Sequence, residues 1–141
     1  MIREISVAIE NQPGRIYELA RALGNEGVTI AALSVADREM RGVLRLVTSD
    51  VPRTRQALMR LDVPATVHEV IAVDARDEAG GLAAVLEPLQ QSGIDVRYLY
   101  AFRGFAPGRA AIVLHTDDDG RSEELLKSRG FSMLSEVAIH G

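Results

Sequence analysis

Two segments of the sequence repeat each other at a constant spacing of 66 residues. Residues 11–34 and residues 77–100 align without a gap, and Gly14 and Gly27 of the first segment fall on Gly80 and Gly93 of the second. Apolar positions match at the same spacing: Ile16 with Leu82, Leu19 with Val85, Leu23 with Leu89, Val28 with Ile94, Ile30 with Val96 and Leu33 with Leu99. Self-similarity at one period indicates two copies of one structural unit. We therefore expect two units, residues 1–70 and residues 71–141.

Each copy has the pattern strand, helix, strand, strand, helix, strand. Runs of alternating β-branched residues predict the strands, and apolar residues at helical spacing predict the helices. The elements expected in the first copy are strands at 3–9, 28–36, 43–49 and 66–73 and helices at 13–25 and from Pro52. Pro13 suits a first helical turn, and Gly24 and Gly27 suit the end of that helix.

The second copy repeats this order, with one proline in an unusual place. The elements expected are helices at 82–91 and 121–129 and strands at 94–102, 110–116 and 131–139. Pro88 lies inside the first of these helices and is expected to kink or shorten it. The strand at 66–73 closes the first copy, and two alternatives stay open: it also opens the second copy, or one strand is exchanged between the copies.

The order βαββαβ is the split-βαβ, ferredoxin-like arrangement. The expected fold class is therefore α+β, with two such repeats side by side and an antiparallel sheet that carries its helices on one face. A copy of about 70 residues has a marginal core by itself, so the copies are expected to bury a shared surface. Because outer sheet edges need cover, a homodimer is also expected.

Composition excludes several classes of function. The net charge is −4, whereas a protein that binds nucleic acid by neutralising phosphates usually has a basic surplus, so no nucleic-acid partner is expected. The chain has no cysteine, which excludes disulfides, thiolate nucleophiles and zinc sites built on sulfur. With no signal-peptide core and no apolar run near the ~20 residues of a membrane helix, we expect a cytoplasmic protein with no membrane partner.

Motifs of catalysis and of cofactor binding are missing from the sequence. It has no GxxxxGK[ST] phosphate loop and no GxSxG nucleophile turn. His68, His115 and His140 stand singly, without the spacing of metal ligands. We therefore expect no cofactor, no metal site and no catalytic residues, and a protein that is not an enzyme.

The first strand-to-helix turn carries a recognisable motif. Residues 9–16, IENQPGRI, resemble the turn of the ACT domain family, which has the pattern N/D-x-P-G with an apolar residue two positions on. Residues 22–30, ALGNEGVTI, resemble the helix, glycine and strand that follow it in that family. Both copies fit, so the resemblance covers nearly the whole chain, and the chain is most similar to small stand-alone proteins with two ACT domains.

The resemblance implies regulatory binding of a free amino acid at an interface between two ACT units. The turn supplies backbone amides to the ligand, and the facing unit supplies part of its second strand. The residues that match are Asn11, Gln12, Pro13, Gly14, Arg15 and Ile16 in copy one and Asp77, Glu78, Ala79, Gly80, Gly81 and Leu82 in copy two. Where the family often has Asn before the second strand, this chain has Thr29 and Asp95. These departures, with Ala79 in place of the proline, predict one competent pocket or two of unequal affinity.

The physical chemistry of the turn agrees with this prediction. A helix N-terminus has free N–H groups and a partial positive charge, and can hold a carboxylate. Gly14 and Gly80 have no Cβ, so a ligand can approach the backbone closely. Two interpretations remain for Asn11 and Asp77, which either cap the helix or bind the ligand amino group. Arg15 either pairs with the ligand carboxylate or is an exposed charge of the first turn.

Three aromatic residues alternate on the strand expected at 94–102. Tyr98, Tyr100 and Phe102 share one side of the sheet, where copy one has the small residues Ala32, Ser34 and Ala36. Three interpretations of this contrast remain. In the first, the large and small residues form facing walls of a pocket; in the second, the aromatics pack in an interface core; in the third, they stack on bases as in RNA-binding sheets. The first alternative makes Ser34, Tyr98 and Tyr100 candidate ligand-binding residues.

Three functions compete on this basis. The favoured function is an amino-acid sensor in which the bound ligand acts on a partner or on the oligomer. The second is an interaction module or regulatory subunit that docks onto a metabolic enzyme, and the third is a small enzyme on a ferredoxin-like scaffold. Stoichiometric binding of a small ligand distinguishes the first from the second, and a clustered acid/base or nucleophile set is what the third requires.

Overall fold

The computed structural model describes residues 1–10, 12–38 and 41–140. By its internal contacts the chain divides into two compact units. Residues 3–68 form what we call the first unit, and residues 69–141 together with residues 1–2 form the second unit. The division falls within one strand, β4 (Ala65–Arg76), so that this strand contributes residues to both units.

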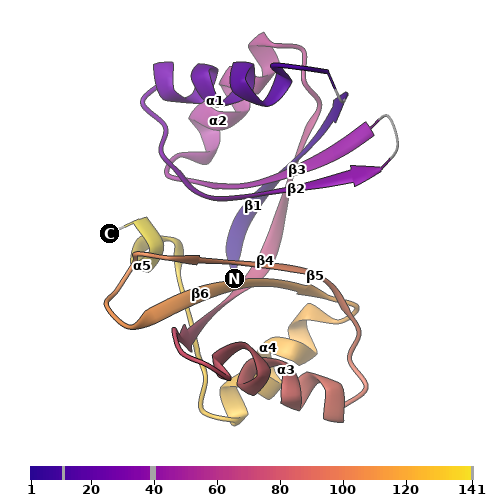
Figure 1. Cartoon of the computed structure of the whole chain (residues 1–141), viewed down its shortest axis with the longest axis vertical. Helices are drawn as coiled ribbons and strands as arrows, with labels where there is room; N and C mark the ends of the chain where they lie inside the picture. Colours follow the sequence, from indigo (N-terminus) through magenta and orange to yellow (C-terminus); the bar gives the residue numbers. More distant parts are fainter. Residues whose placement is uncertain (11, 39–40, 141) are drawn as a thin grey trace. The chain divides into compact units, whose positions relative to one another are not determined.

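The first unit is a sheet with two helices on one face (Figure 1). Its elements are β1 (Ile2–Glu10), α1 (Arg15–Asn25), β2 (Ile30–Arg38), β3 (Arg41–Thr48) and α2 (Val51–Arg60), followed by the start of β4. The strand order is β2-β3-β1-β4, and β3 pairs antiparallel with both β1 and β2. Strand β2 therefore lies at an edge. Ile5, Val7 and Ile9 alternate along β1 and pack with Leu19 and Leu23 of α1 in the aliphatic core.

The second unit repeats this arrangement (Figure 1). Its elements after β4 are α3 (Gly81–Gln91), β5 (Val96–Arg103), β6 (Arg109–Thr116), α4 (Asp119–Ser128), β7 (Ser132–Met133) and α5 (Glu136–His140). Strands β5, β6 and β4 follow one another in the sheet, and the short β7 pairs with β4. Val85 and Leu89 of α3 pack with Ile71, Val73 and Leu114 in the core.

The expected fold class is confirmed, because both units are βαββαβ repeats with antiparallel pairing and helices on one side of the sheet. Strand β4 is the last strand of the first repeat and the first strand of the second. One strand therefore serves both copies, which resolves the alternatives left open for residues 66–73.

Two elements of the second unit differ from expectation. The strand expected at 131–139 is only two residues long, and a short helix follows it. Ser135 explains the change, because its hydroxyl accepts a hydrogen bond from the Ala138 amide at 3.3 Å and so begins the helix. Helix α3 also continues past Pro88 to Gln91 instead of ending at it. Pro88 is buried beside Val85 and Leu89, and this packing offsets the hydrogen bond that a proline cannot donate.

The duplication extends to individual hydrogen bonds, but at a changed spacing. The hydroxyl of Thr48 bonds that of Thr54 at 2.8 Å, and the hydroxyl of Thr116 bonds that of Ser122 at 2.7 Å. These pairs are 68 residues apart rather than 66, because the β5–β6 connection is longer than the β2–β3 connection. The register gives the same result, since Glu10 lies opposite Arg41 and Arg76 lies opposite Arg109. Gly42 therefore corresponds to Ala110, whereas a spacing of 66 residues would match it with Gly108.

Candidate functional site

Each unit has a pocket at the end of its first strand, and the same segments line both. In the second unit these are the end of β4, the turn before α3, the start of β6 and the loop after α4. Its lining residues are Asp74, Arg76, Glu78, Ala79, Gly80, Gly81, Ala84, Arg109, Gly130, Phe131 and Ser132. In the first unit they are Ala8, Ile9, Glu10, Gln12, Arg15, Arg41, Asp62 and Pro64. The volumes are about 490 and 460 Å³, within the range of small-molecule sites.

The turn before each helix depends on a glycine in a left-handed conformation. Gly14 has a φ of 82° and Gly80 a φ of 83°, and each is the N-cap residue of the helix that follows. The N-cap residue of α3 is Gly80, and among the described residues no side chain caps either helix by a hydrogen bond. Asp77 is therefore not the cap of α3, contrary to one interpretation. A Cβ at either glycine would have open space around it, but an L side chain rarely adopts this φ.

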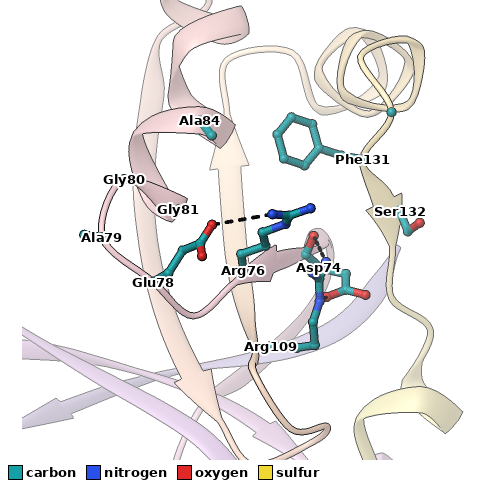
Figure 2. Close-up of a pocket in the computed structure, with 11 residues that line it drawn as sticks. Asp74, Arg76, Glu78, Ala79, Gly80, Gly81, Ala84, Arg109, Phe131 and Ser132 are labelled. Atoms are coloured by element: carbon teal, nitrogen blue, oxygen red, sulfur yellow. Dashed lines mark hydrogen bonds and ion pairs between the residues drawn. The ribbon is translucent and has the colours of Figure 1, made fainter.

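The charged groups of the second pocket occur as two pairs (Figure 2). Arg109 donates from Nε to Asp74 Oδ1 at 2.7 Å and from Nη2 to the Asp74 carbonyl oxygen at 3.4 Å. Both side chains are largely shielded from solvent, with 35% and 23% of their surfaces exposed. The Arg76 guanidinium lies 3.8 Å from the Glu78 carboxylate, and this pair is well exposed. The pocket thus has a fixed ion pair at its base and a looser pair at its mouth.

The first pocket carries a different set of charges. Arg15 pairs with Glu18 at 3.0 Å, and Gln12 donates to the Glu10 carboxylate at 3.0 Å. Arg41 enters the pocket from the start of β3, at the position that Arg109 holds in the second unit. Asp62 holds the place of Gly130 and has a φ of 54°, a conformation that Asp tolerates better than most residues.

Both pockets are balanced in charge. Each is lined by two arginines and two carboxylates: Arg76, Arg109, Asp74 and Glu78 in one, and Arg15, Arg41, Glu10 and Asp62 in the other. Arginine binds carboxylates through paired hydrogen bonds, and carboxylates attract an ammonium group. This arrangement complements a zwitterion better than it complements a simple anion or cation.

The structure brings some of the expected turn residues together in the pockets and leaves others outside. Gln12 and Arg15 line the first pocket, and Ala79, Gly80 and Gly81 line the second. Asn11 lies outside the described residues. The remaining turn residues are exposed and are not among the lining residues: Pro13, Gly14, Ile16, Asp77 and Leu82. Asp77 instead pairs with Arg103 at 3.1 Å.

Ser34 and the two tyrosines lie away from these pockets. Ser34 of β2 lies opposite Arg45 of β3, on the face of the sheet that α1 and α2 do not cover. Tyr98 and Tyr100 alternate with Leu99, which packs against the core of the second unit, so they project from the other face. The Tyr98 ring is 5.1 Å from that of His115. Their role as ligand-binding residues stays a prediction.

Sequence reasoning missed pocket residues in both halves of each repeat. In the first half they are Ala8, Ile9 and Glu10 of the first unit and Asp74, Arg76 and Ala84 of the second. In the second half they are Arg41, Asp62 and Pro64 of the first unit and Arg109, Gly130, Phe131 and Ser132 of the second. A signal for the second-half residues exists, because these half-repeats match at the spacing of 68 residues. The alignment at 66 obscures this match.

Two further features bear on other kinds of function: clusters of metal-ligating side chains and helices able to span a membrane. Among the described residues, no cluster of three or more His, Asp or Glu side chains is placed to hold a metal ion. Within the same part of the chain, every helix is too short or too polar to cross a lipid bilayer.

The chain is similar to a known protein family and to several solved structures. A family model for an ACT domain pair matches residues 1–140. A crystal structure of a Bacteroides thetaiotaomicron protein is similar with a TM-score of 0.88 and 25% identity, covering 98% of this chain and 94% of that one. The regulatory subunits of aspartate kinase from Thermus thermophilus and Thermus flavus share the fold, with TM-scores of 0.62 and 0.61 and identities of 13% and 14%. They cover 89% and 98% of this chain and 91% and 90% of their own. No curated protein matches the sequence.

Proposed function

This chain belongs to the ACT domain family, and on that premise we propose that it is a non-catalytic regulatory protein that binds a free amino acid. The observation that carries the proposal is the recurrence of one pocket, at the glycine turn of both repeats, with two arginines and two carboxylates each time. A free amino acid is a zwitterion, and this set of groups offers a partner to each of its charges.

The second pocket is the stronger candidate because its base is already organised. Asp74 holds Arg109 through Nε, which leaves the Nη1 hydrogens of the guanidinium to meet a ligand carboxylate. The turn at Gly80 brings the positive end of α3 to the pocket, where the Gly81 N–H already donates to the Glu78 carbonyl oxygen at 3.0 Å. A ligand bound here pays little ordering entropy, since the groups it meets are held before it arrives.

The proposal is tested by a thermal-shift screen of the full chain against the twenty common amino acids. A ligand that binds only the folded state stabilises it, by about 2.7 kcal/mol at a hundredfold excess over Kd. We expect one amino acid or one chemical group of them to raise the melting temperature. Arg109→Met should reduce that shift, because it removes a cation from the pocket.

Gly80→Val and Gly93→Val form the control pair for this screen. Both glycines have a positive φ, 83° and 69°, so valine strains the backbone at each, but only Gly80 lies at the pocket. We expect Gly80→Val to abolish the ligand-induced shift and Gly93→Val to retain it. If all twenty amino acids leave the melting curve unchanged up to millimolar concentration, the isolated protein does not sense free amino acids.

A homodimer and a cytoplasmic location complete the proposal. The edge strand β2 carries Leu33 and Val35, which are 50% and 44% exposed, and a second copy would cover them. The absence of cysteine is consistent with a reducing compartment.

An alternative function is that of a regulatory subunit which docks onto a metabolic enzyme. The similarity in fold to the two regulatory subunits of aspartate kinase favours it. Isothermal titration separates the alternatives, because a subunit that only docks takes up no amino acid in the absence of its enzyme.

A further inference from the structure

The two pockets are equivalent in position but differ in the wall that faces the charged groups. Figure 2 shows the Phe131 ring and the Ala84 methyl on one side of the second pocket, with the Asp74–Arg109 pair on the other. Ala84 is exposed and Phe131 half-buried, so both present apolar surface to the pocket. Opposite the ion pair, the second pocket therefore offers an apolar wall.

The first pocket lacks apolar lining at the two equivalent positions. The position of Ala84 is held by Glu18, which pairs with the pocket residue Arg15 at 3.0 Å. The position of Phe131 is held by Val63, which is only 5% exposed and packs in the core of the first unit. At these two positions, therefore, the first repeat has a charged residue and a core residue where the second has apolar lining.

We infer that the second pocket selects an amino acid with a large apolar side chain, and that Phe131 sets this preference. The inference rests on the proposed function and adds the class of ligand. A ligand whose carboxylate meets Arg109 would direct its side chain past the exposed Arg76 guanidinium toward Phe131 and Ala84 (Figure 2). Contact with the ring buries apolar surface of the ligand, whereas a polar side chain there loses water without gaining a partner.

The preference is measurable by calorimetric titration of the full chain with leucine, phenylalanine, alanine and serine. Each added methylene in an apolar pocket contributes ~10-fold or more in affinity. We expect leucine or phenylalanine to bind at least ~10-fold more tightly than alanine or serine. Phe131→Ala should bring the affinities together by weakening the large ligands, with little change for alanine.

A second variant protects the test against misfolding, since part of the Phe131 ring packs against the core of the second unit. Ala84→Glu changes an exposed pocket residue to the residue that the first repeat has, and it too should remove the preference. Tyr17→Ala is the matched control, because it removes a ring that is 65% exposed on α1 and outside both pockets. This variant should bind as the unmodified protein does.

The outcomes separate the inference from the proposed function. If amino acids bind but the preference survives both Phe131→Ala and Ala84→Glu, the apolar wall does not select the ligand and the inference is overturned, while amino-acid binding stands. The same holds if alanine or serine binds as tightly as leucine. If none of the four binds but another of the twenty amino acids does, the inference is overturned and amino-acid binding stands. If none of the twenty binds, the proposed function is wrong as well.

Discussion

Gly81 and Arg15 occupy the same position of the repeat, yet only one of them tolerates a side chain. A Cβ built on Gly81 would lie 2.1 Å from the carbonyl oxygen of Arg76, far inside van der Waals contact. The second turn therefore closes more tightly on its preceding strand than the first turn does. Close approach of the backbone, rather than a positive φ, is the reason for glycine at this position.

Gly81→Ala is predicted to destabilise the protein by about 1–3 kcal/mol, since the new methyl forces the backbone apart. Gly24→Ala is the matched control. Gly24 lies within α1, and a Cβ there would meet nothing within 4 Å. Alanine should stabilise that helix by roughly 0.5–1 kcal/mol. Chemical denaturation of the two variants checks the prediction, and equal stabilities would contradict it.

Single residues also mark where sequence reasoning about the site succeeds and fails. The glycine turns were predictable because a left-handed φ requires glycine at Gly14 and Gly80. Asp77 was open to interpretation as a cap because a carboxylate near a helix start usually is one. In the structure it pairs with Arg103, a residue 26 positions later in the sequence whose approach depends on the fold.

The outer strands of the two repeats differ in ways that bear on assembly. Strand β2 contains no charged residue before its last two positions, Asp37 and Arg38, and its apolar side chains Leu33 and Val35 are exposed. Strand β5 is the corresponding edge of the second unit, and Arg97 and Arg103 lie near its two ends. Charged residues on an edge strand discourage pairing with another chain, whereas an uncharged apolar edge permits it.

Leu33→Lys is therefore predicted to convert a dimer into a monomer. Lysine places a charge on the edge of β2, and because Leu33 is half exposed the fold itself should lose little stability. Ala101→Lys makes the equivalent change on the exposed surface of β5 and should leave the dimer intact. Light scattering gives the mass of each variant. A monomeric parent protein, or equal effects of the two lysines, would contradict a dimer built on β2.

At the level of elements, strand and helix order was predictable because period-2 and period-3.6 patterns recur in both copies. The failures are local. The chain end at 131–139 alternates like a strand, but Ser135 caps a helix there. A proline inside a helix usually shortens it, but α3 continues past Pro88 because the proline ring is buried. In both places a contact made by the folded chain overrode the local pattern.

Across the whole molecule, duplication has preserved the pocket and redistributed its charges. Both pockets have an arginine at the start of the third strand of the repeat, Arg41 in the first and Arg109 in the second. At other positions the copies differ: Ala8 corresponds to Asp74, and Arg15 corresponds to Gly81. The sum of charges in each pocket is nevertheless the same. This shared balance supports the proposal that both pockets bind a zwitterion.

Two ligand sites of unequal affinity are therefore predicted for each chain. Calorimetric titration of a large apolar amino acid should show a tighter site, with a second site at least ~10-fold weaker, a difference of about 1.4 kcal/mol in binding free energy. The tighter site should disappear in Gly80→Val and the weaker one in Gly14→Val. Valine strains a φ of 83° at a lining residue of the second pocket, or a φ of 82° between the lining residues Gln12 and Arg15 of the first, and leaves the other pocket untouched. If a single binding event is lost in both variants, the two pockets do not act as separate sites. Loss of the tighter site in Gly14→Val alone would instead assign the principal ligand to the first repeat.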